Sequence, residues 1–230
     1  LMPIVSSETI LKEKHEKIRM VEILWDMEFT KTIREVNKFY PNAIVCARLP
    51  MEYGVEEKIL DILNSVCSVI NLEGSCIGRS MDDESRFVKD IIPAANLALV
   101  NRGIRDEITL LASGGFAMAE HVAKAILCGV DAVFIDFPVL IALECRMCRR
   151  CEQGLPCPVE IETASSKWVS SRTINMFGVW HNQLLEVMGA MGIRDVRRLR
   201  GEVGRAIFFD EMERDTFGAL CNLGEGVELE

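Results

Sequence analysis

The chain lacks a long apolar run, a surplus of positive charge and any Ser-His-Asp arrangement of the kind that serine hydrolases use. No apolar run approaches the ~20 residues that span a bilayer, so no membrane insertion is predicted. The formal net charge of −9 argues against a surface that binds nucleic acid or an anionic membrane. The sequence also shows no internal repeat, no low-complexity segment and no signal peptide at its start. No cysteine stands at its N-terminus, so no amidotransferase half is predicted within this chain.

Apolar residues and cysteines, by contrast, are abundant. Hydrophobic residues make up 49% of the 230 residues, which predicts a globular chain with a sizeable core. The length is that of one domain or two small ones. The 9 cysteines are odd in number and partly clustered, which favours a reducing compartment over a disulfide framework. We therefore expect a cytoplasmic protein.

Four of the cysteines form a tight C-x2-C-x2-C-x5-C-P run at Cys145, Cys148, Cys151 and Cys157. Thiolates at such short spacings let one loop wrap around a metal cluster, and the run is close to the bacterial ferredoxin pattern, which also ends in Cys-Pro. A structural zinc site is the second interpretation, although zinc motifs more often consist of two separate C-x2-C pairs. Chance clustering of free thiols, or a disulfide, is the third.

Apolar strands alternate with helices through residues 21–144, which predicts parallel βα units. We predict an α/β fold: a partial or reduced (β/α) TIM-type barrel, a cysteine-rich loop and a C-terminal helical extension. The expected divisions are a barrel-like domain over residues 1–144, a cluster loop with linker over 145–178 and helices over 179–230. The predicted strands are residues 21–25, 43–49, 66–72, 107–112 and 132–136, and the predicted helices are residues 7–19, 29–39, 55–65, 84–102, 117–128, 138–144, 179–192 and 195–216.

A candidate phosphate site follows the predicted strand over residues 107–112. Ser113, Gly114 and Gly115 connect this strand to a helix. Glycines there let backbone N–H groups approach an anion, and the helix N-terminus adds its dipole. The next strand ends at Asp136, whose carboxylate would repel a phosphate. A tight βα turn without a ligand explains the glycines at least as well.

Two blocks of the sequence resemble the FMN-binding barrel of glutamate synthases. Residues 110–145, LLASGGFAMAEHVAKAILCGVDAVFIDFPVLIALEC, are similar to the family's ASGGI turn, DVAKAI-x-LGADAV helix–strand and ALIALGC entry into an iron–sulfur loop. Residues 184–205, LLEVMGAMGIRDVRRLRGEVGR, are similar to the end of the archaeal-type synthase domain. The resemblance implies a barrel that reduces 2-iminoglutarate to glutamate with FMN and with electrons relayed by a cluster.

The resemblance also implies roles for particular residues. The FMN phosphate would lie at Ser113–Gly115, next to Asp136, and the flavin ring near Arg48, where a cation can stabilise reduced flavin. Three cysteines match the family's [3Fe–4S] ligands, and Cys148 is an additional thiol. Four thiolates favour [4Fe–4S], because each iron then has its own ligand, and [3Fe–4S] is the alternative. The matching three are Cys145, Cys151 and Cys157.

The sequence departs from the family pattern in several places. Arg48 stands where the family has a lysine, Asp136 stands in the family's phosphate turn, and the glycine-rich loop at residues 73–80 matches only in part. About five strands are predicted before the cysteines, whereas a closed barrel of this class has eight. The first part of the family domain is therefore missing, dispensed with or on another subunit.

Two functions are predicted from these features. The first is a glutamate-synthase-like oxidoreductase domain or subunit that relays electrons through an iron–sulfur cluster to FMN and forms glutamate. The alternative is a degenerate, non-catalytic half-barrel that keeps the cluster and acts as an electron-transfer or scaffold subunit. Either function would need a redox partner, which would be a ferredoxin-like protein or a reductase subunit. Either would also need a further subunit or a second copy of the chain to cover the open strand edges. Three cations beside the cysteines would attract an acidic partner or balance the cluster's charge: Arg146, Arg149 and Arg150.

Overall fold

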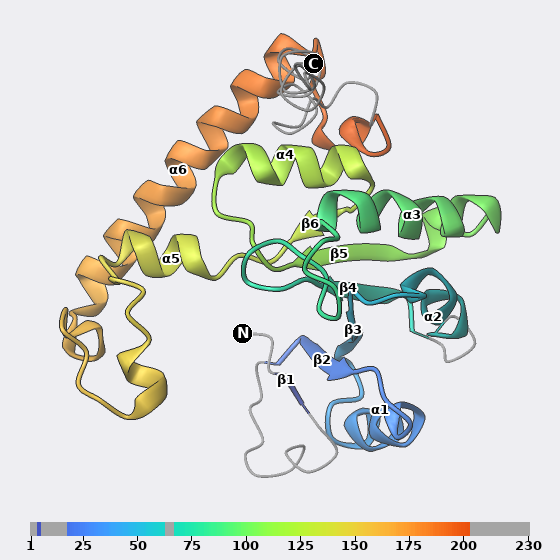
Figure 1. Ribbon diagram of the computed structural model, residues 1–230, viewed down its shortest axis with the longest axis horizontal. Helices are drawn as coiled ribbons and strands as arrows, with labels where there is room; N and C mark the ends of the chain where they lie inside the picture. Colours follow the sequence, from blue (N-terminus) through green and yellow to red (C-terminus); the bar gives the residue numbers. More distant parts are fainter. Residues whose placement is uncertain (1–3, 6–17, 63–66, 203–230) are drawn as a thin grey trace, which may run out of the picture.

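The computed structural model describes residues 4–5, 18–62 and 67–202 of the chain. Within them six parallel strands form one sheet, in which each strand pairs with its neighbours in the sequence (Figure 1). This order is that of a barrel wall, because a doubly wound sheet reverses its strand order at a switch point. The strands are β1 (Ile4–Val5), β2 (Met20–Leu24), β3 (Ile44–Pro50), β4 (Val69–Glu73), β5 (Thr109–Ser113) and β6 (Ala132–Val133).

Helices connect the strands and cover one face of the sheet. The first four helices each lie between two successive strands, and Figure 1 shows them along the outside of the curved sheet. The last helix is long and packs against the fourth and fifth helices. The helices are α1 (Phe29–Phe39), α2 (Val55–Ile62), α3 (Val88–Asn101), α4 (Ala119–Cys128), α5 (Phe137–Ala142) and α6 (Ser166–Ala190), and the 3-10 turns are η2 (Arg105–Glu107), η3 (Arg150–Gln153), η4 (Ile161–Thr163) and η5 (Val196–Leu199).

The main hydrophobic core lies between the sheet and these helices. Alternate residues of a strand point to the same face, and one row of paired residues across β2 to β5 is at most 2% exposed. Burying each isoleucine or leucine side chain of this row stabilises the fold by roughly 1.5–3 kcal/mol. The row is Ile23, Ala47, Ile70 and Leu110, and it belongs to the same core as Phe29, Val36, Ile59, Ile91, Leu99 and Ile126 from the helices.

The opposite face of the sheet corresponds to the interior of a closed barrel. It carries a smaller apolar cluster of Cys46, Val69 and Leu111. Burial raises the pKa of the Cys46 thiol, and the nearby Glu22 carboxylate raises it further. Within the described residues β1 and β6 are the two edges of the sheet and do not pair with each other. The predicted α/β partial barrel is therefore confirmed, and the part of it that the structure describes is open between β1 and β6.

The five predicted strands are all present, and the structure adds β1 at the edge of the sheet. The strand predicted over residues 132–136 is the least accurate of them, because β6 contains only two residues. The helix predicted over residues 29–39 has the bounds of α1. The helix predicted over residues 84–102 begins later, at Val88, and continues through Pro93.

The C-terminal helical region differs from the prediction. The helix predicted over residues 179–192 is the second half of the 25-residue α6, which begins at Ser166. The Ser165 hydroxyl caps it by accepting a hydrogen bond from the Trp168 N–H at 3.3 Å. The start was missed because most of α6 is exposed, with Met188 as its buried residue, so its first turns carry no apolar stripe. Of the helix predicted over residues 195–216, the described residues contain only η5, and most of that over 7–19 also lies outside them.

An ion-pair network ties the end of the described chain to the edge of the sheet. The buried Arg105 side chain donates to the Asn96 Oδ1, to the carbonyl oxygens of Ile108 and Gly129, and to the Asp131 carboxylate at 2.9 Å. Arg200 donates to the other Asp131 oxygen at 2.7 Å. The network therefore joins η2, the start of β6 and the chain beyond η5. No described helix has the length and apolar character needed to cross a membrane.

Candidate functional site

The carboxyl ends of the parallel strands carry a row of polar side chains on the open face of the sheet. Arg48 lies near the end of β3, and its side chain forms a two-point ion pair with Glu73 at the end of β4. The Arg48 Nε donates to the Glu73 Oε2 at 2.7 Å, and the Nη2 donates to the Glu73 Oε1. This hydrogen bonding raises the pKa of Arg48. Arg48, the cation predicted to face a flavin ring, is thus held in place by Glu73, whose carboxylate balances its charge.

A second group of polar side chains lies beside this pair. Glu22 on β2 is 3% exposed and Asn71 on β4 is 2% exposed. The Asn71 Nδ2 donates to the Glu22 Oε1 at 2.6 Å and to the Ser113 Oγ at 3.2 Å. Among the described residues the Asn71 Oδ1 is buried and has no hydrogen-bond partner. The strand ends therefore bring Ser113 into a buried polar cluster rather than leaving it at a surface turn.

The two glycines of the predicted phosphate turn are required by backbone packing. Gly114 has φ +97°, and a Cβ there would lie 2.1 Å from the Gly74 carbonyl oxygen. Gly115 has φ +74°, and a Cβ there would lie 2.3 Å from the Gly78 nitrogen. The turn after β5 thus packs directly on the loop after β4, which explains both glycines without a ligand. Phosphate binding by Ser113–Gly115 stays a prediction.

Asp136 occupies the other half of the predicted phosphate site. Its Oδ1 accepts a hydrogen bond from the Phe137 N–H at 2.6 Å, and its carbonyl oxygen accepts from Val139 and Leu140. Pro138 has no N–H to offer. The carboxylate therefore occupies the start of α5, where a phosphate would otherwise find N–H donors. A flavin phosphate does not fit this turn, because it would meet a fixed negative charge and N–H groups that are already bonded.

The cysteine loop connects α5 to α6 and turns repeatedly. Figure 1 shows it in yellow, projecting from the body of the protein between these two helices. Glu144, Met147 and Arg149 have left-handed φ values of 64°, 52° and 56°. Non-glycine residues are uncommon in this conformation and concentrate at functional sites. Arg172 on α6 holds the start of the loop, because it donates to the Ala142 carbonyl oxygen at 2.7 Å and pairs with Glu144.

Backbone N–H groups point at two of the four sulfur atoms. The Met147 N–H donates to the Cys145 Sγ at 3.4 Å. Hydrogen bonds from the Ile161 and Val159 N–H groups lower the pKa of the Cys157 thiol. Such N–H···S contacts stabilise thiolates and tune iron–sulfur centres.

The four thiols do not converge in this structure. Cys148 and Cys151 are exposed, and Cys145 and Cys157 are partly buried. Among the described residues no three cysteine, histidine or carboxylate side chains come close enough together to hold a metal ion. The donor set and the N–H groups fit a thiolate-bound cluster.

Sequence reasoning identified Arg48 and Ser113 but missed their partners Glu22, Asn71 and Glu73. A signal for these was present in the strands themselves. Glu22 and Asn71 each interrupt an otherwise apolar strand, VEIL and VINL. A polar residue inside a buried strand is rarely tolerated unless it is hydrogen-bonded or functional.

Comparisons with known proteins agree with this architecture. Residues 17–194 match the family described as the conserved region in glutamate synthase. Over 137 residues the chain is 35% identical to the archaeal glutamate synthase [NADPH] of Methanocaldococcus jannaschii. It is 31% identical, also over 137 residues, to that of Archaeoglobus fulgidus. Each match covers 55% of this chain and 27% of the relative, so the chain spans well under half the length of these relatives.

Solved structures show the same fold. A mutant flavocytochrome b2 with pyruvate bound superposes with a TM-score of 0.55 at 15% identity, covering 93% of this chain and 55% of that chain. Mandelate oxidase superposes with a TM-score of 0.53 at 12% identity, covering 80% of this chain and 54% of that chain. At such identities the likeness concerns the fold alone, and it agrees with a barrel wall of which this chain forms a part.

Proposed function

Because this chain belongs to the family defined by the conserved region in glutamate synthase, we propose that it is an oxidoreductase segment that carries an iron–sulfur cluster and relays electrons. The observation that carries the proposal is the loop over residues 145–157, which combines four thiols with left-handed turns and N–H groups directed at sulfur. When bound, such a cluster supplies one-electron transfer. The ligands would be Cys145, Cys148, Cys151 and Cys157.

The surrounding residues have definite tasks in this proposal. Arg172 fixes the entry of the loop to α5, so the first cysteine keeps its position relative to the end of the sheet. The N–H groups after Cys157 favour its thiolate form, which is the form that binds metal. The arginines between the cysteines balance the negative charge of a thiolate cluster and favour an acidic redox partner, either ferredoxin-like or a reductase subunit.

The strand ends support a relay that has no flavin of its own. Arg48 is bound to Glu73, and Asp136 occupies the place where a phosphate would bind. We therefore propose that the flavin and substrate are held elsewhere, on the further subunit or second copy that covers the open edges at β1 and β6. The second candidate is a glutamate-forming flavoenzyme domain or subunit, which is favoured by the family membership and by the resemblance of the Ser113–Gly115 turn to the family's ASGGI turn.

An anaerobic visible spectrum of the chain, with iron, sulfide and flavin assayed on the same sample, tests the proposal. We expect brown absorption with iron and sulfide but without flavin bands. Cys148→Ser should lower the iron content, or convert a four-iron cluster to a three-iron one, because one iron loses its ligand. Cys76→Ser, an exposed cysteine outside the loop, is the matched control and should leave the spectrum unchanged.

The other outcomes are equally informative. Stoichiometric flavin alongside the cluster would favour the second candidate over the relay. A colourless protein that contains zinc, or one that contains no metal after anaerobic reconstitution with iron and sulfide, would refute both redox functions.

A further inference from the structure

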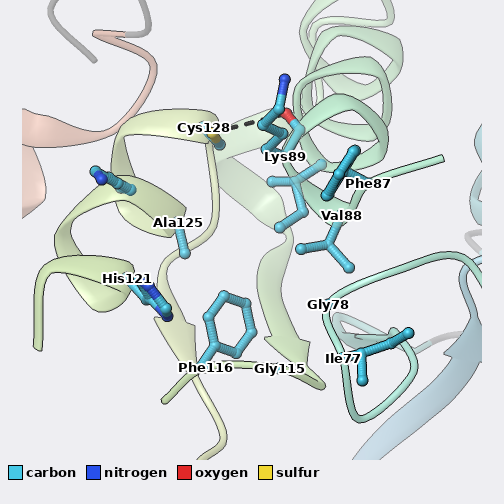
Figure 2. A pocket seen from close by; sticks show the side chains of 12 residues that line it. Ile77, Gly78, Phe87, Val88, Lys89, Gly115, Phe116, His121, Ala125 and Cys128 are labelled. Carbon is cyan, nitrogen blue, oxygen red and sulfur yellow. Dashed lines mark hydrogen bonds between the residues drawn. The ribbon is translucent and has the colours of Figure 1, made fainter. Parts of the chain in front are cut away.

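A cavity of about 280 Å³ opens between α3 and α4, on the helix-covered side of the sheet (Figure 2). It is bounded by the loop after β4 at Ile77 and Gly78, and by the turn after β5 at Gly115 and Phe116. Its residues are not those of the polar cluster at the strand ends, nor those of the cysteine loop. The remaining lining residues are Phe87, Val88, Lys89, Ile92, His121, Lys124, Ala125 and Cys128.

The walls of the cavity are mainly apolar and aromatic. Figure 2 shows the Phe116 ring on the α4 side, with Val88 and Phe87 on the α3 side. A dry apolar cavity of about 150 Å³ is enough to bind benzene. The present cavity is nearly twice that size, so it has room for one aromatic ring with a short side chain.

A histidine in the cavity wall favours a ligand that accepts a hydrogen bond. The His121 Nδ1 accepts a hydrogen bond from the Ala117 N–H at 3.2 Å, so the neutral imidazole carries its proton on Nε2 and can donate it. Lys89 and Lys124 also line the cavity, but the Lys89 ammonium pairs with Asp90 at 3.2 Å and the Lys124 ammonium with Glu120 at 3.9 Å. The His121 N–H is therefore the polar group on which recognition of a ligand rests.

We propose that this cavity is a binding site for a small aromatic carboxylate. The ring lies between Phe116 and the apolar residues of α3, and the carboxylate accepts a hydrogen bond from the His121 Nε2. A carboxylate suits the site better than an amine, because the His121 Nε2–H is a donor that a carboxylate oxygen can accept, whereas an ammonium group offers only further donors. The ligand also touches both the Gly78 loop and the Gly115 turn, so it braces the contact between them.

Titration with 3-phenylpropanoate, followed by calorimetry and by amide chemical shifts, tests this site. We expect saturable binding with a Kd near or below about 1 mM, which is modest for a ligand of this size. The shifts should concentrate at residues 77–78, 87–92 and 115–128. Acetate, which lacks the ring, and 3-phenylpropylamine, which reverses the charge, should bind at least tenfold more weakly.

Two variants and a control assign the binding to the cavity. His121→Gln should weaken it about tenfold, the loss expected for one charge-assisted hydrogen bond. Ala125→Leu fills the cavity and should abolish binding while circular dichroism confirms a folded chain. His181→Gln, which alters a histidine that does not line this cavity, should leave the affinity unchanged. Equal affinity for the amine, shifts centred elsewhere, undiminished binding by folded Ala125→Leu, or no binding by the unaltered chain would overturn the proposal.

Discussion

Replacing Asp131 with asparagine should cost about 3 kcal/mol of unfolding free energy, through loss of the charge that balances two arginines. Arg105 is 6% exposed and cannot turn to water when its carboxylate partner is lost. Asp131 also accepts the Leu110 N–H at 2.8 Å and one guanidinium nitrogen of Arg200 at 2.7 Å. Breaking a buried pair by removing one partner costs about 3–5 kcal/mol. The lower end applies here because the Asp131 side chain is 25% exposed and Arg105 keeps its carbonyl partners.

Urea unfolding of the two proteins, followed by circular dichroism, measures this loss. With a slope of about 2 kcal/mol per molar, the midpoint should fall by about 1.5 M. Asp106→Asn is the matched control, because Asp106 pairs with the same Arg200 but is 91% exposed. An exposed pair contributes about 0–1 kcal/mol, so the control should shift the midpoint by less than about 0.5 M. Equal shifts for the two variants, or a loss under about 1 kcal/mol for Asp131→Asn, would show that the buried guanidinium does not depend on Asp131.

Three further predictions concern other parts of the chain. Burial opposes ionisation of Asp131, but hydrogen bonds lower its pKa in the folded state. Its contribution to stability is therefore present above the unfolded pKa of 3.8 and is lost as the pH falls through the lower folded pKa. Asp131→Asn should thus flatten the acid limb of a curve of unfolding free energy against pH. Gly114→Ala places a Cβ 2.1 Å from a carbonyl oxygen and should lower the melting temperature much more than Gly154→Ala, which shares a positive φ but has open space around it. Asn71→Asp would set a second carboxylate beside Glu22 and should lower the unfolding free energy by roughly 2–3 kcal/mol at neutral pH. Part of this stability should return on acidification, because one carboxylate then takes up a proton. A loss that urea unfolding shows to be independent of pH would contradict this reason.

The candidate site shows where sequence reasoning succeeds and where it stops. Glycines, cysteines and Asp136 stand out because their residue types are informative at particular spacings. Glu73 does not stand out, since a glutamate at the end of a strand is ordinary until the fold places it against Arg48. Asn71 likewise acquires meaning only from the register that sets it between Glu22 and Ser113.

The sequence by itself determined the alternation of strands and helices, the parallel α/β class and the position of the cysteine loop. These follow from local periodicity and spacing, which act within a few residues along the chain. Only the tertiary structure decided that Gly114 is held against the loop after β4, that Arg48 is paired with Glu73, and that Asn71 is bonded to Glu22. Each of these depends on atoms from segments that are distant in the sequence. Such contacts exist only once the strands have paired and their ends have met.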